Sequence, residues 1–240
     1  MKRAAGEGLL SGAGRGLLFD PALVPEPRPD LLDRATWAGR ATGHAGRGRG
    51  GVTFVAADSG EWALRHYRRG GLVGRMIDDR YLFTGADRTR GFREWRMLAA
   101  LHGRGLPVPR PVAASFRRTG LTCTGDIATL RIPGAEPLSA RLSARGPEAQ
   151  PWASIGRTIR RFHDAGAWHA DLNAHNILLD ASDAPWLIDF DRGRFRAPGG
   201  WREDNLARLE RSLRKIAGEP GAPAFSPSGW AELLAGYSAG

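Results

Sequence analysis

Cysteine is almost absent from this chain of 240 residues, because Cys123 is the only one. A single thiol forms no intrachain disulfide and no cysteine-based zinc cluster, so we expect a reducing compartment. Long apolar runs are also lacking: no stretch reaches the roughly 18 apolar residues of a membrane-spanning helix. The first twenty residues begin with a basic tip, but Arg15 and several glycines interrupt the apolar run of a secretory signal. We therefore expect a protein that is soluble or lies peripherally on a membrane.

Acidic residues are scarce relative to basic ones, with 25 Asp and Glu against 35 Lys and Arg and a formal net charge of +10. Nearly all the basic residues are arginine, whose forked guanidinium suits phosphate and carboxylate partners better than lysine does. An anionic partner explains this excess, but a genome that favours arginine codons explains it equally well. Composition leaves both explanations open.

Hydrophobic residues make up 42% of the sequence, enough to bury a core in one large domain or in two lobes. Residues 1–35 are rich in glycine and proline, so we expect an extended arm outside the core. Residues 53–67 predict two strands joined by the turn Asp58-Ser59-Gly60. Residues 88–105 predict a helix, because apolar residues recur every three positions. These residues are Phe92, Trp95, Leu98 and Leu101.

The second half of the chain predicts two more helices and a short hairpin. Residues 151–166 and 205–216 each carry apolar side chains at helical spacing. Residues 176–190 predict two short strands separated by a polar turn. Between a strand predicted at 121–132 and the first of these helices, the sequence PGAEP breaks the pattern at a point where two lobes could hinge.

The hairpin carries the strongest chemical signal in the sequence. His169, Asp171 and Asn176 form the pattern H-x-D-L-x-x-x-N, and Asp189-Phe190-Asp191 follows at the end of the next predicted strand. This order matches the catalytic loop and the metal-binding segment of eukaryotic-like kinases. Phosphoryl transfer needs a carboxylate that accepts the proton of the attacking hydroxyl, a role that suits Asp171, and oxygen ligands for Mg²⁺, which suit Asn176 and Asp189. We expect His169 to brace the loop.

The first half of the chain should supply contacts to the phosphates of ATP. The glycine-rich segment Gly46–Gly51, with Gly48, Gly50 and Gly51, would let backbone N–H groups approach a phosphate, although a solvent-exposed loop has the same composition. Arg65 stands where kinases place a strand lysine, and Glu94 follows on the predicted helix. We expect these two residues to form an ion pair, with a plain surface arginine as the alternative.

Four segments together resemble the family of lipopolysaccharide core heptose and Kdo kinases, in which Kdo is 3-deoxy-D-manno-octulosonic acid. They are LRHYRRGGLVG, GLPVPRPVAA, HADLNAHNILLD and LIDFDRGR, and the likeness runs from about residue 36 to residue 216. The resemblance implies an α+β, bilobal protein-kinase-like fold. Residues 36–134 would be a small β-rich N-lobe with one main helix that covers the ATP phosphates. Residues 135–240 would be a mostly helical C-lobe with the catalytic loop and the metal site.

The resemblance also implies an activity, a phosphotransferase reaction with an alcohol group as acceptor. The γ-phosphoryl group of ATP, with Mg²⁺ as the metal, would pass to the 4-hydroxyl of a Kdo residue in Kdo-lipid A during lipopolysaccharide inner-core biosynthesis. The implied location is peripheral, at the cytoplasmic face of the bacterial inner membrane, against an anionic surface.

Two departures from protein kinases favour a small or lipid-linked acceptor over a protein. Ala170 replaces the arginine that grips an activation-loop phosphate, and no A-P-E sequence follows Asp191. We predict that Arg68, Arg69 and Arg75 contact phosphate or carboxylate groups of the acceptor, because they follow the strand that would face the ATP phosphates. The helix at 205–216 is expected mainly to pack in the core, and its basic side chains are a second candidate for a membrane contact.

Three other functions remain open from the sequence. A small-molecule kinase of the aminoglycoside or choline type would share the catalytic loop and differ in its acceptor. A pseudokinase scaffold would explain Arg65 and the altered D-F-G sequence, but not the intact Asp171, Asn176 and Asp189. A nucleic-acid binder would explain the positive charge but not the catalytic spacing, so we expect no nucleic acid as a partner.

Overall fold

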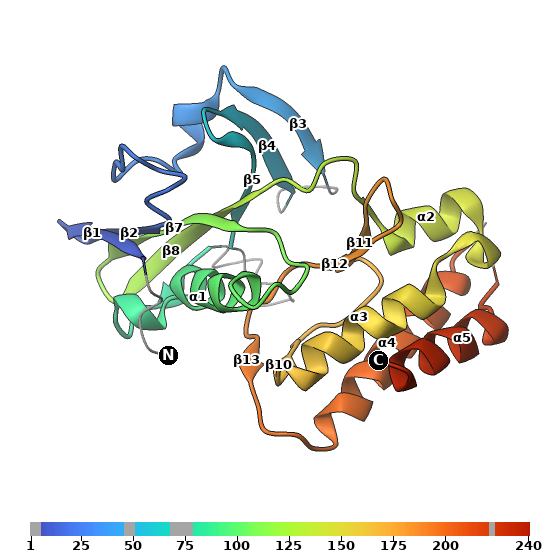
Figure 1. Cartoon of the computed structure of the whole chain (residues 1–240). Helices are drawn as coiled ribbons and strands as arrows, with labels where there is room; N and C mark the ends of the chain where they lie inside the picture. Colours follow the sequence, from blue (N-terminus) through green and yellow to red (C-terminus); the bar gives the residue numbers. More distant parts are fainter. Residues whose placement is uncertain (1–5, 46–50, 68–78, 221–223) are drawn as a thin grey trace. The chain divides into compact units, whose positions relative to one another are not determined.

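The computed structural model describes residues 6–45, 51–67, 79–220 and 224–240 (Figure 1). The fold is mixed α and β, and every strand pair among these residues is antiparallel. The chain divides into two compact units. Unit 1 contains Met1–Ala100 and Arg110–Arg131, and unit 2 contains Leu101–Pro109 and Ile132–Gly240.

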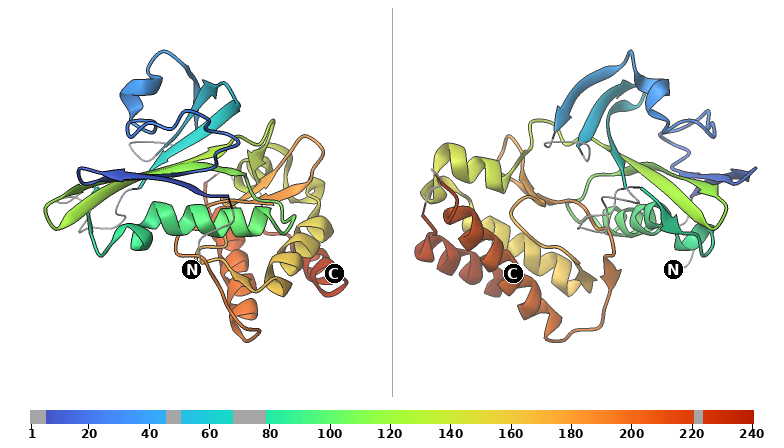
Figure 2. Two further views of the ribbon diagram at one scale, coloured as in Figure 1. Left: turned by 60° about the vertical axis from the view of Figure 1, so that its left-hand side comes forward. Right: turned by 180° about the vertical axis from the view of Figure 1, so that it is seen from behind.

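Unit 1 is built on an eight-stranded antiparallel sheet. Its strands are β1 (Gly8–Gly12), β2 (Arg15–Phe19), β3 (Ala41–Ala45), β4 (Val52–Ala57), β5 (Gly60–His66), β6 (Tyr81–Leu82), β7 (Pro111–Thr119) and β8 (Thr122–Leu130). They lie in the order β1-β2-β7-β8-β5-β4-β3, and β6 pairs with β8. Most of α1 (Arg90–His102) belongs to this unit and lies along one face of the sheet (Figures 1 and 2). Among its described residues, unit 1 also contains the short 3-10 helices η1 (Arg34–Trp37) and η3 (Ala86–Arg88).

The apolar patterns of the sequence explain the core of unit 1. The predicted hairpin is confirmed as β4 and β5, with Gly60 in the turn at a positive φ of 119° that favours glycine. Val55 and Trp62 face the core from neighbouring strands, and the rings of Trp62 and Trp37 lie 5.2 Å apart. The predicted helix is confirmed as α1, and its four apolar residues are buried.

The N-terminal segment is not the extended arm that its composition predicts. Residues 8–19 form the β1–β2 hairpin, and β2 pairs with β7. Leu17 and Leu18 are fully buried, and the Glu7 carboxylate forms an ion pair with buried Arg96 of α1 at 3.0 Å. The prediction was wrong because the apolar run Leu17–Phe19 outweighs the glycines around it once β7 gives it a partner strand.

Unit 2 contains most of the helices. They are α2 (Leu138–Arg145), α3 (Trp152–Asp164), α4 (Trp201–Ala217) and α5 (Pro227–Ser238), with the short 3-10 helix η4 (Pro147–Ala149). The strands β9 (Glu136–Pro137), β11 (Ile177–Leu179) and β12 (Pro185–Leu187) form a sheet in the order β12-β11-β9, and β10 (Ala167–Trp168) pairs with β13 (Arg194–Phe195). The structure confirms both predicted helices, which are α3 and α4. It also confirms the predicted hairpin, which is formed by β11 and β12. The sequence does not predict α2 and α5.

Glycine allows α5 to pack closely against α3. A Cβ atom on Gly156 of α3 would lie 2.0 Å from the carbonyl oxygen of Leu233, and one on Gly236 of α5 would lie 2.2 Å from that of Ala153. Real Cβ atoms do not approach backbone atoms so closely, so each helix has a glycine where the other passes. The two helices therefore meet backbone to backbone.

Replacing Gly156 by alanine is expected to lower the free energy of unfolding by about 1–3 kcal/mol, because the added methyl group forces α3 and α5 apart. Gly200, at the start of α4, is a matched control because its φ of −59° is helical and a Cβ there meets nothing within 4 Å. Gly200→Ala should leave stability unchanged or slightly higher. Urea unfolding of both variants measures the difference, and equal stability would contradict this account of the contact.

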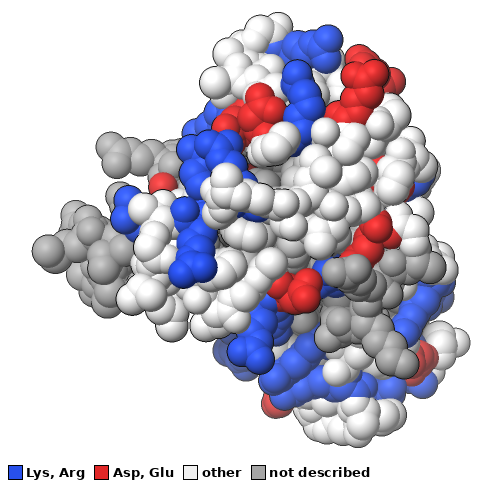
Figure 3. Space-filling model, turned by 90° about the vertical axis from the view of Figure 1, so that its left-hand side faces the viewer, with Lys and Arg blue, Asp and Glu red and all other residues white. Residues whose placement is uncertain are grey.

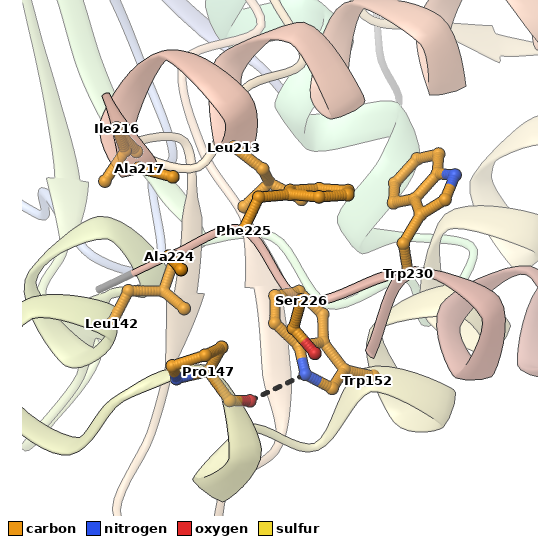
Figure 4. A pocket seen from close by; sticks show the side chains of 10 residues that line it. All are labelled: Leu142, Pro147, Trp152, Leu213, Ile216, Ala217, Ala224, Phe225, Ser226 and Trp230. Carbon is orange, nitrogen blue, oxygen red and sulfur yellow. Dashed lines mark hydrogen bonds between the residues drawn. The ribbon is translucent and has the colours of Figure 1, made fainter. Parts of the chain in front are cut away.

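The chain after α4 returns to pack beside α2 and α4. Phe225 and Trp230 lie there with Leu213 and Ile216, and Trp152 Nε1 donates a hydrogen bond to the carbonyl oxygen of Pro147 at 2.8 Å (Figure 4). The space among these side chains is about 20 Å³, which holds little more than one water molecule. It is a packing gap of the core and offers no room for a ligand.

Many arginines of unit 1 serve internal ion pairs. Examples are Arg96 with Glu7, Arg110 with Asp20, Arg117 with Asp33 and Arg131 with Glu61. On the face drawn in Figure 3, Lys and Arg side chains form several groups with acidic side chains among them. Part of the arginine excess is thus structural. Among the described residues, no helix has both the length and the apolar character required to cross a membrane.

Candidate active site

The predicted catalytic loop joins β10 to β11 in unit 2, and His169 fixes its shape. The His169 side chain is buried, with 2% of its surface exposed. Nε2 donates to the carbonyl oxygen of Ile188 at 2.8 Å, and Nδ1 accepts from the backbone N–H of Asp171 at 3.1 Å. Burial lowers the pKa of His169, which keeps the ring neutral with one donor and one acceptor. The ring therefore ties the loop to the β12 side of the hairpin.

Asn176 closes the other end of the loop. Its Nδ2 donates to the carbonyl oxygen of Asp171 at 2.9 Å, and its own carbonyl oxygen accepts from the N–H of Ile188 at 3.1 Å. Among the described residues, no donor occupies its Oδ1. The amide thus holds the loop through one atom and leaves an oxygen for another partner.

Asp189 directly follows Ile188, whose N–H donates to the carbonyl oxygen of Asn176 across the β11–β12 hairpin. The hairpin therefore places Asp189 close to Asn176. Its φ is 62°, a left-handed value that L residues seldom adopt and that Asp tolerates better than most. The next residue, Phe190, is fixed in the core. Its ring stacks on that of Phe162, with 5.6 Å between the ring centroids, and its centroid lies 4.6 Å from that of the His169 ring. Such strain is maintained where the surrounding packing determines the backbone, and it is common at functional sites.

Asp171 supplies the carboxylate of the loop, and 58% of its side chain is exposed. Arg208 of α4 donates to its Oδ1 at 2.6 Å. The sequence does not predict this contact, because the two residues are 37 positions apart and nothing in the periodicity of α4 distinguishes one arginine from the next. Arg208 orients the carboxylate and supplies a positive charge beside it.

Asn205 is a second residue of α4 that the sequence does not identify. It is buried, its Oδ1 accepts from the backbone N–H of His169 at 3.3 Å, and its Nδ2 donates to the carbonyl oxygen of His169 at 3.0 Å. A buried asparagine in a helix with an otherwise apolar inner face is the signal that could have identified it. One side chain therefore satisfies both backbone groups of the residue that braces the loop.

Asn205→Ala is expected to lower the free energy of unfolding by about 2–4 kcal/mol, because it leaves two buried backbone groups without partners. Chemical denaturation measures the change. Glu203→Ala, an exposed substitution in the first turn of α4, is the control and should have little effect. A loss for Asn205→Ala no larger than for the control would show that the paired hydrogen bonds contribute nothing.

The predicted ion pair of Arg65 and Glu94 is present in unit 1. Arg65 Nη2 contacts both carboxylate oxygens of Glu94, at 2.5 and 2.6 Å, and the Glu94 side chain is only 2% exposed. The sequence does not predict the third member, Tyr67, whose hydroxyl donates to Glu94 Oε2 at 2.5 Å and whose ring lies 5.1 Å from the Arg65 guanidinium. The helix α1 thus fixes the cation at the end of β5.

The model of the lipopolysaccharide kinase (Kdo/WaaP) family matches residues 35–237. The chain belongs to this family. The resemblance drawn from the four sequence segments is therefore confirmed, and the protein is a phosphotransferase.

Relatives of this Kdo/WaaP-family chain carry a more specific name. Proteins called 3-deoxy-D-manno-octulosonic acid kinase from Stenotrophomonas maltophilia R551-3 and from Xanthomonas campestris pv. campestris B100 are 48% and 47% identical, over 86% of this chain and 84% of their own. One from Xylella fastidiosa 9a5c is 46% identical over 89% of this chain and 84% of its own. The names describe those proteins and bear on the acceptor considered below.

Phosphoryl transfer from ATP generally uses a divalent metal at the phosphates, and the residues present would fit Mg²⁺. Among the described residues no group of three His, Cys, Asp or Glu side chains could hold a metal alone. Mg²⁺ does not require one, since it keeps several waters and uses one or two protein oxygens together with substrate phosphates. Asn176 Oδ1 and the Asp189 carboxylate are oxygen ligands of that kind.

Several predicted residues of this kinase fall outside the part that the structure describes. They are Gly48 and Gly50 of the glycine-rich segment and the acceptor candidates Arg68, Arg69 and Arg75. Gly51 is described and directly precedes β4. Their predicted roles rest on the sequence.

Proposed function

We propose that this chain transfers the γ-phosphoryl group of ATP to the 4-hydroxyl of a Kdo residue in Kdo-lipid A. The observation that carries the proposal is the loop geometry, in which an exposed Asp171 is held by His169 and Asn176 next to the strand end that bears Asp189. The names of the three relatives support Kdo as the acceptor.

In the proposed reaction, the acceptor hydroxyl donates its hydrogen bond to the Asp171 carboxylate. As its oxygen bonds to the γ-phosphorus, the bond between that phosphorus and the bridging oxygen of ADP breaks, and the proton passes to Asp171. Asn176 Oδ1 and Asp189 would hold Mg²⁺, which supplies charge stabilisation at the phosphates when bound. His169 and Asn205 keep the loop in position throughout.

We also propose that the fold is protein-kinase-like and bilobal. Residues 36–134 would act as the N-lobe that covers the ATP phosphates, with Gly48, Gly50 and Gly51 in the covering loop. Residues 135–240 would act as the C-lobe. The content of the two units supports this assignment, because unit 1 contains the eight-stranded sheet and unit 2 the loop, the hairpin and α2 to α5.

Arg65 is proposed to contact the phosphates of ATP while Glu94 holds it. Arg65→Lys keeps the charge but loses the other guanidinium nitrogens, which would bind a phosphate while Nη2 contacts Glu94, so we expect the KM for ATP to rise roughly tenfold. Arg65→Ala should do more, because it also leaves the buried Glu94 carboxylate without its cation. Steady-state kinetics with varied ATP measure both. An unchanged KM and kcat for Arg65→Ala would refute the role.

The acceptor distinguishes this proposal from a small-molecule kinase of the aminoglycoside or choline type. A screen with labelled ATP and a panel of acceptors, including Kdo-lipid A, an aminoglycoside and choline, tests it. We expect label only in the Kdo-containing acceptor. Transfer to another member of the panel with none to Kdo would identify the alternative.

We propose a peripheral location at the cytoplasmic face of the inner membrane, where the acceptor lies. Arg68, Arg69 and Arg75 are proposed to contact anionic groups of the lipid-linked acceptor. Each cation near an anionic surface contributes on the order of 1 kcal/mol, so together they would hold the chain to such a surface at low salt.

A further inference from the structure

A basic pocket lies beside the catalytic loop in unit 2. Its volume is about 370 Å³, and α4 and the loop both line it. From α4 come Arg208, Arg211 and Lys215, which follow one another at spacings of three and four residues and so share one face of the helix. Asn173 and His175 line it from the loop, and Ser212, Ile216 and Glu219 complete the wall.

The charge of this pocket is largely unneutralised. Arg211 and Lys215 are exposed, and within the described part of the chain neither side chain makes a hydrogen bond or an ion pair. Arg214 on the same helix, in contrast, pairs with Glu210 at 2.7 Å and does not line the pocket. Like charges three and four residues apart lower the stability of a helix, so the arrangement costs the fold free energy. Glu219 is the single acidic residue of the wall, which leaves the pocket suited to an anion.

Arg208 connects the pocket to the predicted catalytic base. Its Nη1 lies 2.6 Å from Asp171 Oδ1, so an anion held by Arg208 and Arg211 would be one side chain away from the carboxylate that receives the proton. The Asn173 side chain is already used within the loop, because it makes hydrogen bonds with the backbone of Asp171, His175 and Asn176. At this separation the anion and the reacting hydroxyl can belong to one small molecule.

We infer that this pocket binds the carboxylate of the sugar-acid acceptor, and that Arg208 moves from Asp171 to that carboxylate when the acceptor binds. The inference rests on the proposed function. A sugar acid carries its carboxylate on the same sugar as the reacting hydroxyl, whereas the phosphates of a lipid headgroup lie on other sugars. Guanidinium groups bind carboxylates through two parallel hydrogen bonds, which would fix the sugar and free Asp171 to accept the proton. When an acceptor without the carboxylate binds, Arg208 stays on Asp171.

The test compares a deacylated Kdo saccharide with its carboxyl methyl ester, using titration calorimetry and the full chain. The parent should bind the acid roughly tenfold or more tightly than the ester, since hydrogen bonds to charged groups are lost on esterification. In the double variant Arg211→Gln/Lys215→Gln the preference for the acid should fall severalfold, because Arg208 alone remains to bind the carboxylate, while Arg214→Gln should keep the parent's preference. Both altered positions are exposed, so the fold is retained.

The binding measurements distinguish a carboxylate from a phosphate as the anion in the pocket. A double variant that keeps the parent's full preference for the acid overturns the inference. If esterification changes nothing but lipid-linked acceptor still binds through Arg211 and Lys215, the pocket holds a lipid phosphate and the carboxylate assignment is wrong. Phosphate transfer to Kdo-lipid A is measured separately, so a failure of the proposed function appears as absent transfer whether or not the pocket binds the acid.

Discussion

Asp171→Asn is expected to lower kcat by about 10²- to 10⁴-fold, the range that a positioned general base contributes. The amide keeps the size of the side chain but cannot accept the hydroxyl proton. The KM for ATP and the free energy of unfolding should change little, because the ion pair with Arg208 lies on the surface and such pairs contribute about 0–1 kcal/mol. Steady-state kinetics and urea unfolding of the same preparation measure both.

Asp204→Asn is the matched control for this substitution. Asp204 is an exposed carboxylate in the first turn of α4, on the helix that also carries Arg208. The same change of charge and shape there should leave kcat near that of the parent. Turnover by Asp171→Asn within a few-fold of the control would contradict the role of Asp171 as the base.

Removal of the Asp189 carboxylate is expected to lower activity by about 10²-fold or more and to weaken the dependence on Mg²⁺, since an electrostatic contact at the transferring phosphate is lost. Asp189→Asn is the better variant than Asp189→Ala, because asparagine tolerates the left-handed backbone at φ 62°. A Mg²⁺ titration of ATP turnover measures the effect.

Asp183→Asn is the matched control, because Asp183 has the same residue type and the same backbone conformation as Asp189. Asp183 also has a φ of 62°, but it lies in the β11–β12 turn and pairs with Arg141. This variant should retain the Mg²⁺ response of the parent. An identical Mg²⁺ response for Asp189→Asn and Asp183→Asn would remove Asp189 from the metal site.

Periodicity in the sequence predicts the elements whose apolar residues follow one period. The hairpin β4–β5, the helices α1, α3 and α4 and the hairpin β11–β12 are of this kind. The strands β1 and β2 are not, because a three-residue apolar run among glycines acquires a partner only from β7, far along the chain. The helix α5 escapes prediction for a related reason, since its glycines serve a close approach to α3 that no local pattern encodes.

The candidate site divides in the same way. The spacing of the kinase catalytic pattern predicts the loop residues His169, Asp171 and Asn176 and the later Asp189. The predicted strand that carries Arg65 and the predicted helix that carries Glu94 together predict their ion pair. Asn205 and Arg208 reach the loop from 36 and 37 residues away, so only the packing of α4 against the loop reveals them. The sequence assigns the basic residues of α4 a secondary role as a membrane contact, whereas the structure places Arg208 on the predicted base.

The most direct test of the proposed reaction is mass spectrometry of Kdo-lipid A after incubation with the full chain and MgATP. We expect a gain of one phosphate, with fragmentation locating it on the Kdo residue, and no gain with Asp171→Asn under the same conditions. An unchanged mass with the active parent, or a phosphate located on the lipid A sugars, would contradict the proposed reaction.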